Sequence, residues 1–115
     1  MLYFGFAIAD SMFPHNCNIN KRMATSEEVR IVIMDLKEEF VPCLNPSHKA
    51  TIGAMKSRFN INVPIPDSPP RVSLSKGDSI YVMAVRGLPR LTDRHEYTDE
   101  EVTKADFVFS LYYVS

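Results

Sequence analysis

The stretch LYFGFAIA, residues 2–9, is a short apolar run rich in aromatic side chains. Its length fits a β-strand, and its nearly continuous apolar character indicates a central strand with both faces covered. Such a strand needs helices or loops on each side of its sheet, so the run predicts a domain of mixed helix and strand. Asp10 interrupts the run and no positively charged segment precedes it, which argues against a signal peptide.

The first predicted helix follows a turn-rich loop, residues 10–23, whose end has room for a short strand. Thr25 and Glu28 form a capping-box pattern, in which each side chain accepts a hydrogen bond from the backbone amide of the other residue. Apolar side chains then recur at helical spacing, at Val29, Ile33 and Leu36. We therefore expect a helix over residues 26–39.

A brief strand and a second helix are predicted next. The sequence FVPCL, residues 40–44, favours a brief edge strand because Pro42 cannot donate a hydrogen bond to a neighbouring strand. Residues 45–60, NPSHKATIGAMKSRFN, favour a second helix that Ser47 caps and Asn60 ends. Its buried stripe is predicted from three side chains: Ile52, Met55 and Phe59.

The last third of the chain predicts a hairpin, a short helix and a final strand. Residues 71–85 place VSL and SIYVMAV on either side of SKGD, whose Gly77 can adopt the positive φ of a tight turn. Thr98 and Glu101 repeat the capping-box pattern at the start of a short helix. The segment DFVFSLYYV, residues 106–114, alternates as a strand.

These elements predict one α/β domain, in the narrower sense α+β, over residues 1–115: a single mixed sheet of about five strands, two longer helices and one short helix. Thirteen basic and fourteen acidic side chains give a net charge of −1. That balance argues against duplex DNA as a partner but leaves room for a small anionic ligand. No apolar run approaches the roughly 20 residues of a membrane helix, so we expect a protein of the cytoplasm. Cys17 and Cys43 lack metal-ligand spacing, and two buried thiols are favoured over a disulfide between them.

His48 is the first candidate for chemistry. With Ser47 as the cap, His48 would lie in the first turn of a helix, where free backbone amides and the helix dipole attract phosphate. A histidine beside a bound phosphate is suited to general acid catalysis. The alternative is a surface histidine without a task, and this residue alone does not decide between the two.

Arg71, Arg90 and Asp93 are the charged candidates. Arg71 follows the stiff segment SPP, whereas Arg90, Asp93 and Arg94 crowd one loop beyond the predicted hairpin. Proteins of the α/β class build anion sites where strand ends and helix starts meet at one edge of a sheet; a solvated charged loop is the alternative. The sequence holds no phosphate-cradling glycine loop, no nucleophile motif and no carboxylate pair with metal-binding spacing. Any catalysis would therefore be metal-free and would depend on His48.

Four segments together resemble a family of small ring nucleases from archaeal viruses and phages, which act as anti-CRISPR proteins against type III immunity. LYFGFAIADSMFP is similar to the opening strand and loop of that family, and SHKAT is similar to its Gly-His-x-x-Thr motif, with Ser47 for the glycine. PPRVSLSKGDSIYVM is similar to its Asn-Arg-Val hairpin and the apolar strand that follows. RLTDRHEYTDEEV is similar to its Arg-Leu-x-Glu loop and Thr-x-Glu-Glu helix, so the resemblance covers nearly the whole chain.

The resemblance implies a homodimer that binds cyclic tetra-adenylate across its two-fold interface. It also implies that the ring is cut without a metal or another cofactor, by attack of a ribose 2′-hydroxyl on the neighbouring phosphate. The catalytic roles fall to His48, as the general acid, and to Asp93, which stands where the family has a glutamate. The resemblance assigns ligand contacts to a further set of residues: Ser11, Ser47, Thr51, Arg71 and Arg90.

Three departures separate this chain from the family pattern. Phe6 stands in place of an asparagine, Asp93 is one methylene shorter than glutamate, and RGLP lengthens the chain before Arg90. These differences leave two other functions open. One is a non-catalytic protein that sequesters the cyclic messenger, and the other is a small dimeric regulator whose charged loop meets protein or DNA.

Overall fold

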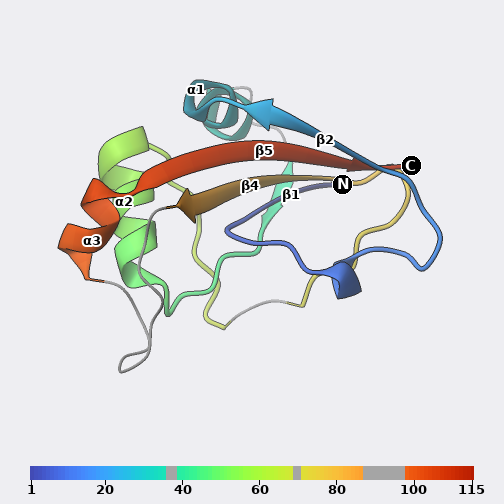
Figure 1. Cartoon of the computed structure of the whole chain (residues 1–115), viewed down its shortest axis with the longest axis horizontal. Helices are drawn as coiled ribbons and strands as arrows, with labels where there is room; N and C mark the ends of the chain where they lie inside the picture. Colours follow the sequence, from blue (N-terminus) through green and yellow to red (C-terminus); the bar gives the residue numbers. More distant parts are fainter. Residues whose placement is uncertain (36–38, 69–70, 87–97) are drawn as a thin grey trace.

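A computed structural model describes residues 1–35, 39–68, 71–86 and 98–115 of the chain (Figure 1). Five strands form one mixed sheet in the order β2-β5-β4-β1-β3. Their bounds are Leu2–Gly5 for β1, Ile19–Ala24 for β2, Phe40–Pro42 for β3, Ser79–Arg86 for β4 and Asp106–Val114 for β5. The predicted α+β class with a single mixed sheet is confirmed.

Strand β1 is the interior strand that the opening apolar run predicts. It lies between β3 and β4 and runs parallel to both, with Tyr3 opposite Val41 on one side and Ile80 on the other. Strand β5 is antiparallel to both β4 and β2. The carboxyl ends of β1, β3 and β4 therefore point to the same edge of the sheet. The strand is shorter than the apolar run, because it ends at Gly5 and the chain turns away from the sheet after it.

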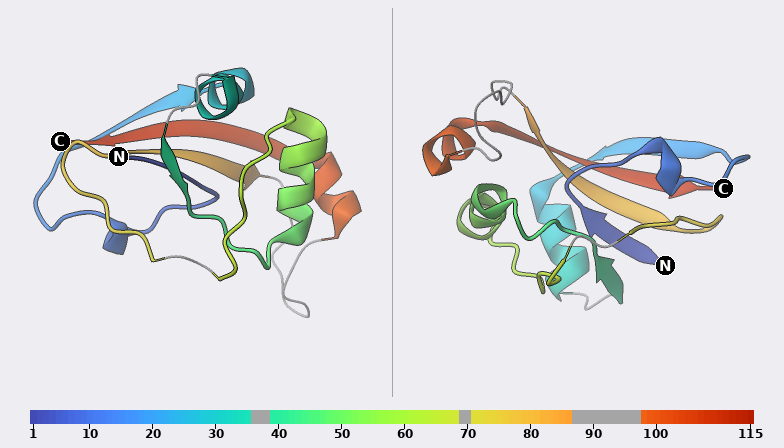
Figure 2. Two further views of the ribbon diagram at one scale, coloured as in Figure 1. Left: turned by 180° about the vertical axis from the view of Figure 1, so that it is seen from behind. Right: turned by 90° about the horizontal axis from the view of Figure 1, so that it is seen from below.

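Within the described residues, three α-helices and two irregular helices accompany the sheet. Helix α1, Ser26–Arg30, continues as a π-helix over Ile31–Asp35. The predicted helix over residues 26–39 is therefore confirmed for residues 26–35; residues 36–38 lie outside the described residues, and Glu39 is not helical. Helix α2, Lys49–Phe59, and helix α3, Asp99–Lys104, lie together at one end of the sheet (Figure 2). A short 3-10 turn, η1, covers Asp10–Met12.

Hydrogen bonds confirm the predicted end of α2 and the predicted start of α3. Asn60 adopts the left-handed conformation with φ of 56°, and the amide of Ile61 donates to the Met55 carbonyl at 3.2 Å. Helix α3 carries both halves of its capping box. The Thr98 amide donates to Glu101 Oε1 at 2.9 Å, and the Glu101 amide donates to Thr98 Oγ1 at 3.2 Å.

Each face of the sheet has its own apolar cluster, so β1 is covered on both sides as predicted. On the helix side, buried side chains of α1 and α2 pack on those of the strands; they include Val29, Ile33, Ile52, Met55, Phe4, Tyr81, Met83 and Phe109. On the other side, the segments 8–17 and 72–74 cover the sheet, and the buried residues of this cluster are Leu74, Ile80, Val82 and Val114. Loops, not helices, thus form the second cover.

The predicted hairpin over residues 71–85 is wrong. Strand β4 begins only at Ser79, and its two neighbours in the sheet are β1 and β5. Both edges of β4 are therefore occupied, and residues 72–74 have no free edge to pair with. Leu74 instead packs on the loop-covered face, and its amide donates to the Met12 carbonyl at 2.7 Å. The tight turn itself is present, with Gly77 at φ of 97°.

A polar cluster ties β2, α1 and β4 together on the helix side of the sheet. Glu28 accepts two hydrogen bonds from Arg22, at 3.0 and 2.6 Å, and one from the Tyr81 hydroxyl at 2.5 Å. The Glu28 amide still donates to Thr25 Oγ1 at 3.0 Å, so only this half of the predicted capping box is formed. The bond from Arg22 is the largest cause that lowers the pKa of the Glu28 carboxyl, against partial burial.

We expect Tyr81→Phe to lower the free energy of unfolding by about 1–3 kcal/mol, because a hydrogen bond to a half-buried carboxylate is lost. Tyr81 is buried, so the phenylalanine ring keeps the apolar packing and isolates the effect of the hydroxyl. Urea unfolding measures the change. The matched control is Tyr113→Phe, which removes the hydroxyl of a 45 % exposed ring and should change stability little. Equal losses in both variants would contradict the assignment.

The parent protein and Tyr81→Phe also allow a test of how stability depends on pH. Burial, followed by the hydrogen bond to Glu28, raises the pKa of Tyr81 from 10.0 to about 12. The folded protein thus holds the phenol proton more tightly than the unfolded chain does. This stabilisation is complete below pH 10 and is lost as the pH rises towards 12. The stability difference between the parent and Tyr81→Phe should narrow over that range.

Candidate functional site

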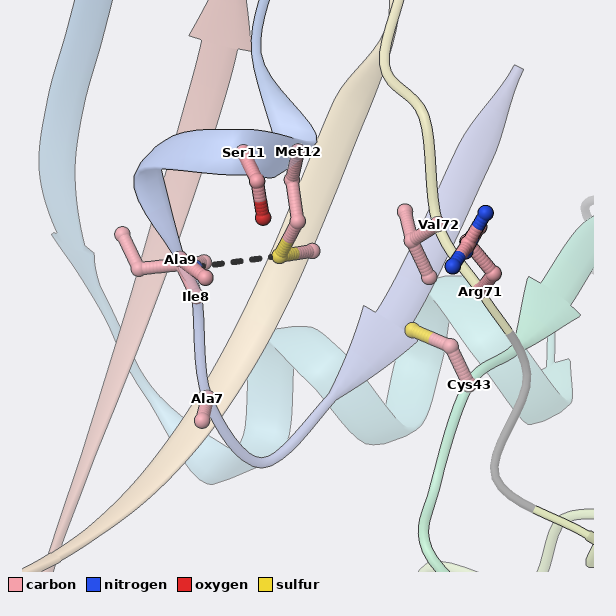
Figure 3. A pocket seen from close by; sticks show the side chains of 8 residues that line it. All are labelled: Ala7, Ile8, Ala9, Ser11, Met12, Cys43, Arg71 and Val72. Carbon is pink, nitrogen blue, oxygen red and sulfur yellow. Dashed lines mark hydrogen bonds between the residues drawn. The ribbon is translucent and has the colours of Figure 1, made fainter.

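A pocket of about 400 Å³ lies at the carboxyl ends of β1 and β3, on the loop-covered side of the sheet (Figure 3). Its lining comes from three separate segments. Most of the wall follows β1, one residue follows β3, and two residues precede the turn before β4. The lining residues are Ala7, Ile8, Ala9, Ser11, Met12, Cys43, Arg71 and Val72.

The 3-10 turn η1 places Ser11 at the pocket. The turn closes through bonds from the Met12 amide to the Ala9 carbonyl, at 3.0 Å, and from the Ala9 amide to Met12 Sδ, at 3.1 Å. The Met12 carbonyl then accepts the Leu74 amide, which fastens the segment carrying Arg71 and Val72 to the turn. Ser11 and Arg71, which are 60 positions apart in the sequence by their numbers, therefore line one pocket.

Cys43 is fixed in the pocket wall by the end of β1. Its amide donates to the Phe4 carbonyl at 2.8 Å, and its thiol donates to the same oxygen at 3.0 Å. Burial raises the pKa of the Cys43 thiol to about 11, so the sulfur is neutral near pH 7. Cys17 and Cys43 are both free thiols, as the sequence favours, but they are half-buried and not buried as predicted.

His48 lies on the helix side of the same edge, and its place in the helix differs from the prediction. His48 is itself the residue that caps α2, with φ of −81° and ψ of 59°, and its side chain makes no capping bond. Ser47 lies one position before the cap, and its amide and its hydroxyl both donate to Asn45 Oδ1, at 2.9 and 2.8 Å. The predicted cap at Ser47 is therefore wrong by one residue.

The His48 ring is exposed and stacks on Phe6. The two ring centroids are 6.4 Å apart and the ring planes differ by 25°. Phe6 packs on the helix-side cluster, whereas its neighbour Ala7 lines the pocket on the loop side. His48 does not itself line that pocket. Ser11 and Arg71 thus form one group, and His48 forms a second group at the start of α2, across the end of β1.

The four remaining predicted residues fall into two groups. Ser47 and Thr51 flank His48, exposed and half-buried respectively, and neither lines the pocket. Arg90 and Asp93 lie outside the described residues. Strand β4, which precedes them in the chain, ends at Arg86 and runs parallel to β1.

The pocket combines one exposed cation with an otherwise small and apolar lining. Arg71 is exposed and Ser11 supplies a hydroxyl, while alanine, isoleucine, methionine and valine side chains provide the remaining surface together with the Cys43 thiol. Such a lining suits a ligand that carries an anionic group next to a flat apolar part. In the described ranges, no group of three metal-binding side chains is gathered, and no helix there has the length and apolar character needed to cross a membrane.

Sequence reasoning missed most of the pocket wall and the partner of His48. Ala7 to Ala9 belong to the apolar run that predicts a continuous strand, and Met12 reads as core filler in the sequence. Met12 does pack on the loop-side cluster, and it also lines the pocket. Gly5 is the one sequence feature that could have indicated the close contact behind the pocket wall. It is the last residue of β1, and an added Cβ there would approach Cys43 Sγ to 2.9 Å.

No protein-family model and no curated protein matches this chain. Its fold is similar to that of a solved structure, the protein B116 of Sulfolobus turreted icosahedral virus. That likeness has a TM-score of 0.66, covers 97 % of each chain and carries 13 % sequence identity. At that identity the likeness shows the fold, and the resemblance to the ring nucleases stays a prediction.

Gly5→Ala should lower the free energy of unfolding by about 1–3 kcal/mol, because the new methyl group would push Cys43 Sγ away from the Phe4 carbonyl. The same substitution should cost much less in a Cys43→Ala background, where the sulfur is absent. Denaturant unfolding of the four proteins gives the coupling energy. Gly53→Ala, at a position on α2 with nothing within 4 Å, is the control and should not destabilise. Independent, additive effects at Gly5 and Cys43 would contradict the packing described.

Proposed function

We propose that this protein is a metal-independent ring nuclease that binds and opens a cyclic oligoadenylate, with cyclic tetra-adenylate as the first candidate. Opening that messenger would counter type III CRISPR immunity, and a viral protein would act in the cytoplasm of its host. The observation that carries the proposal is the shared pocket of Ser11 and Arg71, with His48 at the same edge of the sheet through Phe6. Three of the four segments that resemble the family contribute these residues.

The reaction requires little more than positioning. The ribose 2′-oxygen attacks the adjacent phosphorus, the bond from phosphorus to the 5′-oxygen breaks, and a 2′,3′-cyclic phosphate and a 5′-hydroxyl remain. In the proposal, His48 donates the proton that the leaving 5′-oxygen takes up, while the proton of the 2′-hydroxyl is released to water. Arg71 holds the phosphate as negative charge develops on its oxygens. Arg90 and Asp93 are assigned to the same site by the resemblance alone.

The size of this ligand favours a homodimer. Pockets of roughly 300–1,000 Å³ enclose drug-sized molecules, and a ring of four nucleotides is larger than those. One pocket of about 400 Å³ can therefore hold only part of the ring. A second copy related by a two-fold axis would supply a second pocket to the opposite nucleotide, as the resemblance implies.

One observation favours a second candidate, a protein that sequesters the messenger without cutting it. His48 does not line the pocket that holds Ser11 and Arg71, so this pocket could bind a nucleotide whether or not the imidazole reaches the leaving oxygen. A small dimeric regulator, the third function considered, requires no affinity for cyclic adenylates at all.

The deciding experiment incubates the protein with cyclic tri-, tetra- and hexa-adenylate in the presence of a chelator and separates the products by chromatography. Linear products that end in a 2′,3′-cyclic phosphate support the nuclease. Bound but intact rings support the sequestering protein and exclude the nuclease. The absence of both binding and cutting would overturn the two proposals together.

His48→Ala should lower the ring-opening rate about 10²- to 10⁴-fold, because it removes the general acid. Its affinity for the cyclic ligand should change little, since the phosphate contacts remain. Single-turnover assays and direct binding measurements separate the two effects. A variant that cuts at the parent rate would contradict the role of His48.

Arg71→Ala should weaken binding of the ring about 10- to 100-fold, the effect of one charge-assisted hydrogen bond. The matched control is Lys56→Ala, which removes the same charge from an exposed position near the far end of α2. Isothermal titration of both variants gives the comparison. Equal weakening by the two substitutions would point to a general charge effect and against a phosphate contact at Arg71.

A further inference from the structure

The stack of Phe6 and His48 connects an exposed ring to the interior of the protein. Phe4 is fully buried, and its ring meets the Phe6 ring edge to face, with centroids 6.5 Å apart and planes at 88°. Phe6 in turn presents its face to His48, with planes that differ by 25°. The buried Phe4 ring thus contacts Phe6, and Phe6 contacts the exposed His48 ring.

The amide and the carbonyl of His48 both make hydrogen bonds, whereas its side chain is restrained mainly by the stack on Phe6. The His48 amide donates to the Asn45 carbonyl at 3.1 Å, and the His48 carbonyl accepts the Ile52 amide at 3.0 Å. The imidazole does not cap α2, and the described residues offer it no hydrogen bond. Two side-chain torsions would therefore be open to an exposed histidine here, unless Phe6 restricts them.

A stacked neighbour restricts a ring in a particular way. It favours one plane, by about 2- to 10-fold for an aromatic pair, and leaves the two ring nitrogens at the edge without a fixed partner. A hydrogen-bonding neighbour would instead occupy one of those nitrogens. The arrangement at Phe6 therefore orients the imidazole while both nitrogens stay open to a ligand.

We propose that Phe6 is a positioning residue, which fixes the plane of the His48 ring so that its nitrogens face a ligand at the carboxyl end of β1. The inference rests on the proposed function for its effect on the reaction, and it adds a residue that the sequence resemblance does not assign to the reaction. Phe6 acts through His48 and needs no contact with the reacting atoms.

The test compares Phe6→Leu with Phe6→Tyr, which retains an aromatic face. Phe6→Leu should lower kcat for ring opening about 2- to 10-fold with KM within about 2-fold, because binding depends on other residues. Phe6→Tyr should restore kcat. Phe59→Leu is the control, since Phe59 is a half-buried aromatic residue at the other end of α2 that stacks edge to face on Phe107 and Phe109. It should alter stability and leave kcat unchanged.

A second measurement does not depend on activity. The His48 ring stacks on Phe6, so the ring current of Phe6 should shift the NMR resonances of the His48 ring protons. In Phe6→Leu these resonances should move towards those of His15, an exposed histidine in the loop after η1. Phe6→Met replaces the leucine variant if thermal melting shows that the latter unfolds at the assay temperature.

The outcomes separate the two proposals. An unchanged kcat together with unchanged His48 resonances in Phe6→Leu would overturn the positioning role, and so would a change confined to KM, which would make Phe6 a ligand contact. If the parent opens no ring, the proposed nuclease fails. The NMR comparison then still decides whether Phe6 orients His48.

Discussion

The packing of β1 between two parallel strands is the constraint on which the rest of the structure depends. Four residues, Leu2–Gly5, pair with β3 on one side and β4 on the other, and both faces of the strand are covered. Parallel neighbours end at one edge, so the segments that leave β1 and β3 must meet there. The Phe4 carbonyl fixes the meeting point, since it accepts both the amide and the thiol of Cys43.

Local signals in the sequence predicted the elements well where the stabilising contacts are also local. Such local contacts include the Thr25 cap of α1, the full capping box at Thr98, the helical stripe of α2 and the left-handed Asn60. The hairpin at residues 71–85 failed for the opposite reason. Its second strand is real, but β1 and β5 occupy its edges, and both come from distant parts of the chain. Alternation identifies a strand and does not identify its partner.

The candidate site was predictable only in part, for a similar physical reason. Motif order led to Ser11 and Arg71, and both line one pocket. The apolar wall between them exists because η1 folds Ala9 against Met12 and because Leu74 bonds to that turn, neither of which has a strong sequence signal. The cap of α2 lies at His48, one residue after the predicted Ser47, which instead donates two hydrogen bonds to Asn45 Oδ1.

The candidate site has two parts, one on each side of the end of β1, and this limits which ligands could contact both. Of the first two residues after β1, Phe6 meets the helix-side cluster and His48, whereas Ala7 lines the pocket of Ser11 and Arg71. A molecule confined to the pocket contacts the second set alone. A ligand that contacts both sets must pass over the carboxyl end of β1, where β3 also ends. Ring-shaped or extended oligonucleotides have that reach, because consecutive phosphates and riboses can occupy the two sides of the strand end at once, whereas a single nucleotide seated in the pocket does not.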